Sequence, residues 1–235
     1  MSTKYFILTK SNEKHVANID NDQIIHINRC KTYILPQNNI EYYSSHGLFE
    51  SNLIDWTKQF GSNDKVFLDI GSHTGTYTIA LYDKFKSVYS FEPQKMTYYA
   101  LCGSVALSNA QNVSCIQCGL GSPEQVGNMN LKIVSNDGGG SSLHSTSNIL
   151  REEEIEVKTL DHFNIDNIGF IKMDVEENEL FVLQGALETL VRSNYPPILF
   201  ESNHANEELF EYLQKTLKYR IVKISGCDNM FLAER

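Results

Sequence analysis

Glycines and carboxylates stand at spacings that could bind a nucleoside with a positively charged tail. Asp69 ends the apolar run VFLD (66–69), and Gly71 and Gly75 follow it closely. Because glycine lacks a Cβ, a turn built on it can bend sharply and let a ligand touch the backbone. The first N–H groups of a helix that begins after such a turn lack partners within the helix, so they attract polar or negative groups.

The spacing argues against a dinucleotide. Gly71 and Gly75 form G-x-x-x-G, whereas dinucleotide sites use G-x-G-x-x-G, and Asp69 ahead of the turn would repel a pyrophosphate. Asp69 suits an ammonium group instead. Glu92 follows the next apolar run, where a carboxylate can accept hydrogen bonds from ribose hydroxyls. We therefore favour S-adenosylmethionine (SAM) as the ligand over a structural turn with a solvated glutamate.

A second group of charged residues follows a later apolar run. Lys172, Asp174 and Glu176 alternate along the chain, so they share one face if the strand extends that far. Methyl transfer to a hydroxyl needs a base, for which Asp174 is our first candidate and Glu176 our second. Lys172 would keep Asp174 ionised. Glu176 could instead stabilise a helix start, and a structural salt bridge between Lys172 and Asp174 is the alternative to catalysis.

Other candidates carry weaker signals. His144 lies in the Gly/Ser-rich segment 135–148 and could contact an acceptor as a base or from a lid, although lone loop histidines are commonly solvated. Asp174, Glu201 and Asn203 could bind a divalent cation together with water, but we favour metal-free catalysis. Cys115 and Cys118 form an isolated CxxC, which we interpret as thiols of a core strand.

The elements that must position these residues alternate along the chain. Apolar runs predict strands at 66–69, 87–91, 113–117, 169–173 and 196–201. Helical patterns lie at 76–83, at 96–109, over the leucines at 180, 183, 187 and 190, and at 207–217. Residues 220–225 and 230–235 predict two strands joined by a turn. This alternation predicts a mostly parallel sheet covered on both faces, with ligands beyond the carboxyl ends of its strands.

The chain divides into two predicted parts. Residues 1–60 form an N-terminal extension or cap, with strand-like segments at 5–9 and 23–27 and a helix at 49–60. Residues 61–235 form the main domain. The extension and the segment 135–150 are where we expect the choice of acceptor to reside.

The amino-acid composition limits the classes of partner that the protein is expected to bind. The 235 residues are 41% hydrophobic and 21% charged, as in ordinary globular proteins. The formal charge of -9 argues against binding to nucleic acid or to an anionic membrane. No apolar run approaches membrane-spanning length, and scattered cysteines favour a reducing, cytoplasmic location. These features favour a small-molecule or glycan partner, and they say nothing about the oligomeric state.

The sequence resembles the FkbM-type family of class I SAM-dependent methyltransferases. The most specific segment is FIKMDVE-x-x-E-L-x-x-L-x-G-A, and Glu177 stands where the family usually has glycine. The segments that carry the resemblance are VFLDIGSHTGTYT (66–78), VYSFEPQ (88–94), GGGSSL (138–143), VKTLD (157–161), FIKMDVEENELFVLQGA (170–186) and PPILFESN (196–203).

The resemblance implies a Rossmann-like α/β fold, a seven-stranded sheet of order 3-2-1-4-5-7-6 with strand 7 antiparallel. It also implies SAM as donor and O-methylation of a hydroxyl on a sugar, a glycan or a small molecule. It places Asp69, Gly71 and Thr74 around the methionine end and Glu92 at the ribose. The segment 118–120, with Gly119 and Leu120, borders the adenine.

Two further points stay open at this stage. Glu50, in HGLFE (46–50), could reach the methionine end or lie on the surface. The alternatives to a sugar or small-molecule enzyme are a catalytically silent scaffold and an RNA ribose 2′-O-methyltransferase. The substitution at Glu177 motivates the scaffold, and Lys172 and Asp174 near Glu201 motivate the RNA enzyme.

Overall fold

The computed structural model describes residues 4–10, 30–144, 147–203, 206–227 and 229–235. The strand predicted at 23–27 lies outside these residues. Among the described residues, no helix combines the length and the hydropathy needed to cross a membrane.

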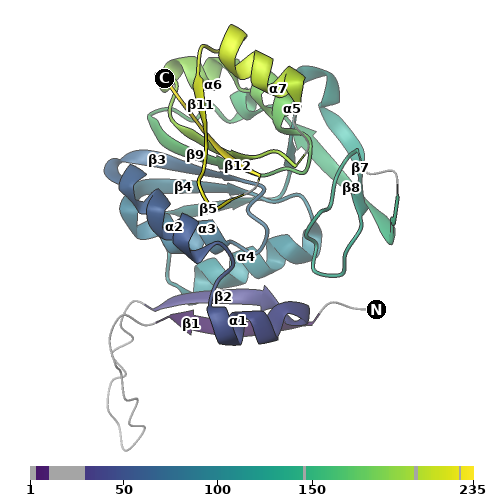
Figure 1. Ribbon diagram of the computed structural model, residues 1–235. Helices are drawn as coiled ribbons and strands as arrows, with labels where there is room; N and C mark the ends of the chain where they lie inside the picture. The colour runs from purple at the N-terminus through teal and green to yellow at the C-terminus, as the bar shows by residue number, and fades with distance from the viewer. Residues whose placement is uncertain (1–3, 11–29, 145–146, 204–205, 228) are drawn as a thin grey trace, which may run out of the picture.

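A seven-stranded sheet forms the centre of the molecule (Figure 1). Its order is β5-β4-β3-β9-β10-β12-β11, and β12 runs antiparallel to both of its neighbours. Numbered along the main domain, this is the predicted order 3-2-1-4-5-7-6, so the fold class is confirmed. The strands are β3 (Ser62–Ile70), β4 (Phe85–Phe91), β5 (Val113–Ile116), β9 (Ile168–Met173), β10 (Ile198–Glu201), β11 (Arg220–Lys223) and β12 (Met230–Glu234).

Apolar side chains on both faces of β3 explain its continuous hydrophobic run. Leu68 and Ile70 pack into the core on one side of the sheet, and Phe67 packs into the core on the other side. A parallel strand covered by helices on both faces needs apolar residues at successive positions. The run before the glycine turn is therefore a consequence of central placement in the sheet.

Helices cover the two faces in two groups. Buried residues of α5 (Glu179–Gln184), α6 (Leu187–Arg192) and α7 (Glu207–Glu211) belong to one core. Buried residues of α1 (Ile40–His46), α2 (Ser51–Thr57) and α3 (Thr76–Leu81) belong to the other. A single-turn 3-10 segment, Tyr82–Lys84, follows α3, and a π-helical segment, Tyr212–Thr216, follows α7. The helix predicted at 96–109 is α4 (Lys95–Leu107).

The helix predicted through the four leucines is two helices. The chain breaks at Gly185, where an added Cβ would lie 2.1 Å from the backbone oxygen of Gly121. Leu183 and Leu190 are buried, whereas Leu187 is 42% exposed. The prediction of one continuous face was wrong here, because the close approach of another backbone segment interrupts the helix.

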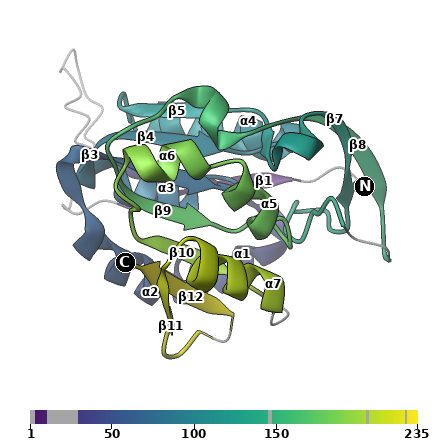
Figure 2. The ribbon, with the colours of Figure 1, turned by 90° about the horizontal axis from the view of Figure 1, so that it is seen from above.

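A second, three-stranded sheet was not predicted. It consists of β6 (Gly119–Leu120), β8 (Arg151–Lys158) and β7 (Gly127–Ile133), in that order. Figure 2 shows β7 and β8 standing out at one end of the molecule, apart from the central strands. The small sheet has its own core of Leu131, Ile133, Ile155 and Val157.

The N-terminal residues form an antiparallel hairpin of β1 (Tyr5–Lys10) and β2 (Lys31–Pro36). The hairpin lies against α4, on the side away from the central sheet (Figure 1). Ser104 of α4 and Ser108, which directly follows α4, accept its backbone hydrogen bonds: Ser108 Oγ from Thr32 N and Ser104 Oγ from Ile34 N, each at 2.9 Å. A single-turn 3-10 segment, Gln37–Asn39, leads from β2 into α1.

Candidate functional site

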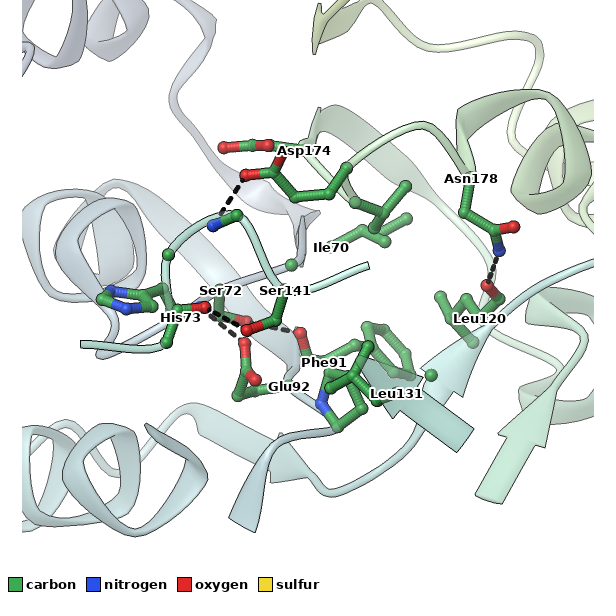
Figure 3. A pocket seen from close by; sticks show the side chains of 18 of the residues that line it. Ile70, Ser72, His73, Phe91, Glu92, Leu120, Leu131, Ser141, Asp174 and Asn178 are labelled. Atoms are coloured by element: carbon green, nitrogen blue, oxygen red, sulfur yellow. Dashed lines mark hydrogen bonds between the residues drawn. The ribbon is translucent and has the colours of Figure 1, made fainter. Parts of the chain in front are cut away.

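A cavity of about 280 Å³ opens beyond the carboxyl ends of β3, β4 and β9. This is where ligands bind in open sheets of this kind. Residues of the turn after β3, the end of β4, the small sheet and the Gly/Ser segment all line it. Figure 3 shows Glu92, Asp174 and Asn178 around this space, with Ile70, Phe91 and Leu131 between them.

The turn after β3 needs glycine. Gly71 has φ +74, and a Cβ on it would lie 1.8 Å from the backbone oxygen of Asp174. The amides of Gly71 and Ser72 donate to the carbonyl oxygen of Phe91, at 3.1 and 3.0 Å. The turn thus packs directly against the backbone at the end of β9 and is hydrogen-bonded to the end of β4.

Three predicted cofactor residues lie beneath this turn. Asp69, Thr74 and Gly75 do not line the cavity. Asp69 is fully buried, and its Oδ2 accepts from the backbone N (2.9 Å) and Oγ1 (2.5 Å) of Thr78, in the first turn of α3. Burial raises the pKa of Asp69 above its ordinary value. Gly75 has φ +89 and immediately precedes α3, so these residues shape the turn from below.

Glu92 lines the cavity and is 7% exposed. Its Oε2 accepts from the amide of His73 (Figure 3), and its Oε1 accepts from the amide of Gln94, both at 2.9 Å. Burial raises the pKa of Glu92 to about 7. His73 has φ +52 and lines the cavity, with its Nε2 2.8 Å from the backbone oxygen of Asp137.

Lys172 and Asp174 meet at the end of β9. Lys172 Nζ donates to Asp174 Oδ2 and to the backbone oxygen of Gly71, each at 3.2 Å. Burial alone would lower the pKa of Lys172, but nearby carboxylates, Asp174 foremost, hold it above its ordinary value. Burial would raise the pKa of Asp174, but Lys172 holds it below. A hydrogen bond with the neighbouring carboxyl of Glu201 also helps to hold the pKa of Asp174 down, so the site holds a charged Asp174 carboxylate.

Two further carboxylates adjoin Asp174. Oxygens of Asp174, Glu176 and Glu201 lie within 4.8 Å of one another. Burial, followed by the charge of Asp174, raises the pKa of Glu201 to about 9. Asn203 Oδ1 accepts from Asn229 Nδ2 at 2.7 Å. The structure thus brings Glu176 beside Asp174 and Glu201, two residues of the predicted metal set, and carboxylate oxygens of this kind suit Mg²⁺ or Ca²⁺.

Glu176 ties the Gly/Ser segment to the end of β9. Its Oε1 accepts from the amide of Gly140 at 3.1 Å, and its backbone oxygen accepts from Ser142 Oγ at 2.6 Å. Burial raises the pKa of Glu176. Residues 138–141 line the cavity, so the segment lies along it. Glu176 and Glu177 both have positive φ, +53 and +76.

His144 lies outside the cavity lining. Its side chain is exposed, its Nε2 is 2.8 Å from Asn178 Oδ1, and its ring stacks on Phe181 at 5.5 Å. Asn178 is 3% exposed and donates from Nδ2 to the backbone oxygen of Leu120 at 2.9 Å (Figure 3). His144 is therefore placed beside the segment of Gly119 and Leu120, and the structure does not bring it to Asp174.

Sequence reasoning missed several lining residues. Tyr77 donates from its hydroxyl to Glu50 Oε2 at 2.9 Å, and both residues line the cavity. The HGLFE segment was a signal for Glu50, whereas nothing in the pattern singled out Tyr77 or Asn178. At the other end, the predicted adenine neighbours Gly119 and Leu120 line an apolar slot, whose residues from β7 and β8 were missed because the small sheet was missed. The slot is lined by Phe91, Gly119, Leu120, Leu131, Leu143 and Ile155.

Residues 69–221 match the family model for the methyltransferase FkbM domain. A solved structure of methyltransferase FkbM from Methylobacillus flagellatus KT is 20% identical with a TM-score of 0.53, covering 73% of this chain and 44% of that chain. A precorrin-6y C5,15-methyltransferase from Geobacter metallireducens GS-15 is 11% identical with a TM-score of 0.50, covering 80% of this chain and 84% of that chain. No curated protein matches.

The two solved structures share the fold, and this chain spans less than half the length of the first. The family model is more specific, because it extends over most of the chain, from the carboxylate before the glycine turn into β11. This chain belongs to the methyltransferase FkbM domain family.

Proposed function

We propose that the protein is a SAM-dependent methyltransferase that acts on a hydroxyl of a sugar, a glycan or a small molecule. One observation carries the proposal: a single cavity joins an apolar slot, the buried carboxylate of Glu92, and the carboxylate of Asp174, which Lys172 keeps ionised. An adenosine with a cationic tail and an acceptor hydroxyl need these three features in this order.

The lining residues fit the donor. The side chains of Leu131, Leu120 and Ile155 give the slot an apolar lining that suits an adenine ring. Glu92 Oε1 and Oε2 each keep a second acceptor direction, so they can also accept from the two ribose hydroxyls. Glu50 supplies negative charge for the ammonium group, while Asp69 supports the turn from beneath. When bound, SAM supplies a methyl group on a sulfonium, a good leaving group.

Asp174 is our proposed base. An acceptor hydroxyl loses its proton as its oxygen bonds to the methyl carbon, and the carboxylate of Asp174, which lines the cavity, takes that proton. Lys172 keeps Asp174 ionised before the reaction. Glu176 is the second candidate, but it already accepts from Gly140. Holding the reacting atoms in line supplies much of the remaining rate.

The charges favour an acceptor without phosphates. Glu50, Glu176 and Asp174 line the cavity, and the lysine beside them is already paired with Asp174. An RNA backbone would meet repulsion here. A divalent cation on Asp174, Glu176 and Glu201 would reduce that repulsion, and we keep metal-free catalysis as the proposal.

Two measurements test this function. Calorimetric titration with SAM and S-adenosylhomocysteine (SAH) is expected to show binding, and turnover against pooled glycans and phenols is expected to yield methylated product. Asp174→Asn keeps the shape of the side chain but is a poor base, so it should bind SAH while losing turnover by about a hundredfold or more. Absence of SAH binding overturns the proposal. Binding without turnover in any pool would favour the silent scaffold, and activity lost on chelation would show a metal requirement.

A further inference from the structure

The bend between α1 and α2 places an aromatic ring at the cavity. Gly47 ends α1 with φ +79, and Glu50 precedes α2 with φ +54. Between these two left-handed residues, Leu48 is 3% exposed, whereas Phe49 is 39% exposed and lines the cavity. The bend thus turns one apolar side chain into the core and leaves the next one at the ligand space.

Other rings hold Phe49 in one orientation. Tyr42 stacks on it, with ring centroids 4.1 Å apart and planes at 15°. The buried ring of Tyr43 meets it edge-on at 5.0 Å and 74°. His46 stacks on Tyr42 at 4.8 Å. Contacts of this geometry stabilise an orientation beyond simple burial, so Phe49 offers a rigid, flat, apolar surface.

A continuous wall connects Phe49 to Asp174. Glu50 is the next residue, and its Oε2 accepts from the hydroxyl of Tyr77. Lys172 Nζ lies 5.3 Å from the ring centroid of Tyr77 and donates to Asp174. A ligand that rests on Phe49 therefore has a carboxylate beside it and the proposed base further along the same wall.

This combination suits a ring with an apolar face and hydroxyls around its edge. Resting on the proposed function, we propose that Phe49 is the acceptor platform and that the acceptor is a pyranose-type sugar ring. The C–H face of the sugar stacks on Phe49. Its hydroxyls donate to the carboxylates of Glu50 and Asp174, since each ionised carboxylate is an acceptor with several lone pairs.

The test is saturation-transfer NMR on the full chain with SAH bound. The probes are the methyl glycosides of glucose, galactose, fucose and rhamnose. At least one glycoside is expected to receive saturation, strongest at the C–H protons of one ring face. Phe49→Ala should weaken its binding roughly two- to tenfold. Phe49→Tyr keeps the ring and should retain binding, and SAH binding should be unchanged in both variants.

Tyr99→Ala removes an exposed ring of α4 that does not line the cavity, and it should bind the glycosides as the parent does. The platform is overturned if Phe49→Ala binds them as firmly as the parent. It is also overturned if the chain binds SAH but none of the glycosides, or takes catechol in their place. Failure to bind SAH at all would instead defeat the proposed function.

Discussion

Glu177 adopts a backbone conformation that normally favours glycine. Its φ of +76 lies in the left-handed region, where a side chain with a Cβ is strained and glycine is not. The family resemblance places glycine here, so the sequence difference and the backbone angle agree. The turn is kept despite the substitution, at a cost in stability.

Replacing this residue should therefore stabilise the protein. Glu177→Gly is expected to raise the free energy of unfolding by about 1 kcal/mol, because it relieves the left-handed strain. Urea denaturation of both proteins measures this difference. Asn167→Gly, at another left-handed position (φ +55), should differ, because Asn167 Nδ2 donates to the backbone oxygen of Asp64 and glycine loses that bond. A less stable Glu177→Gly protein would contradict the argument.

Buried carboxyls make stability depend on pH. Burial raises the pKa of Glu92 and of Glu179 from 4.5 to about 7. Between those two pH values the folded state holds protons that the unfolded state has released, so the free energy of unfolding falls as the pH rises. For one group the fall is at most about 3 kcal/mol.

Glu179→Gln should flatten this dependence. Glu179 is 3% exposed, and its Oε1 accepts from the amide of Val175, a bond that glutamine can also accept. Urea denaturation from about pH 4.5 to pH 7 should therefore show a smaller loss of stability in the variant than in the parent. Equal slopes in the two proteins would mean that Glu179 is not protonated when folded. Glu208→Gln, on exposed α7, is the control and should leave the slope unchanged.

At the scale of elements, the Gly/Ser segment is held over the cavity through Asp137. Its Oδ2 accepts from Asn38 Nδ2 at 2.7 Å, and its Oδ1 accepts from Ser135 Oγ at 2.6 Å and Gly139 N at 3.2 Å. Its backbone oxygen lies by His73 Nε2 in the glycine turn. One residue thus joins the N-terminal part, the segment and the turn.

Asp137→Ala should loosen this junction. Because four side-chain and backbone donors point at its carboxylate, its loss should speed proteolytic cleavage within 135–148 and weaken SAH binding roughly three- to tenfold. Limited proteolysis and calorimetry measure the two effects. Asp166→Ala, at the opposite end of the strands, serves as the control. Unchanged cleavage would show that the segment is held without Asp137.

The elements also show what sequence reasoning can and cannot find. Strands of the central sheet were predictable because residues such as Phe67 and Leu68 face apolar cores on opposite sides. Strand β8 was missed because its exposed glutamates, in REEEIEVK, leave only Ile155 and Val157 as an apolar signal. The break at Gly185 depends on a backbone 64 positions away in the chain, at Gly121, which no local pattern reports.

The same limit applies to the site. Glu92 and Asp174 follow apolar strands, so topology alone brings them to one edge of the sheet. Asp69 has the same signal, but its side chain turns below the loop to Thr78. His144 was chosen for its chemistry alone, and it lies beside Asn178. Side-chain direction in loops follows from tertiary contacts, which spacing does not encode.

At the scale of the whole molecule, the N-terminal hairpin attaches through Ser104 of α4 and through Ser108, which directly follows that helix. Ser108 Oγ also donates to the backbone oxygen of Thr32 at 3.1 Å, and Ser104 Oγ donates to the backbone oxygen of Ala100, within α4, at 2.9 Å. Thr32 is 6% exposed, and its amide has this serine as its partner. The cap is therefore joined to the main domain by buried polar contacts as well as by packing.

Removing both hydroxyls should detach the hairpin before the main domain unfolds. Ser104→Ala with Ser108→Ala leaves the buried amide of Thr32 and the half-buried amide of Ile34 without acceptors, which for the buried one costs about 1–3 kcal/mol. Hydrogen exchange at residues 31–36 should accelerate, while exchange in β3 and β9 stays slow. Ser45→Ala, at an exposed serine of α1, is the control. Uniform acceleration across the chain would contradict separate attachment.

The contact between Gly71 and the carbonyl of Asp174 has a consequence for how such an enzyme can diversify. Because there is no room between them for even one methyl group, the glycine turn after β3 and Asp174, the proposed base, behave as a single rigid unit. Their spacing is then independent of what the cap or the Gly/Ser segment contains. New acceptors can be accommodated by remodelling the periphery, while the geometry of methyl transfer is inherited unchanged.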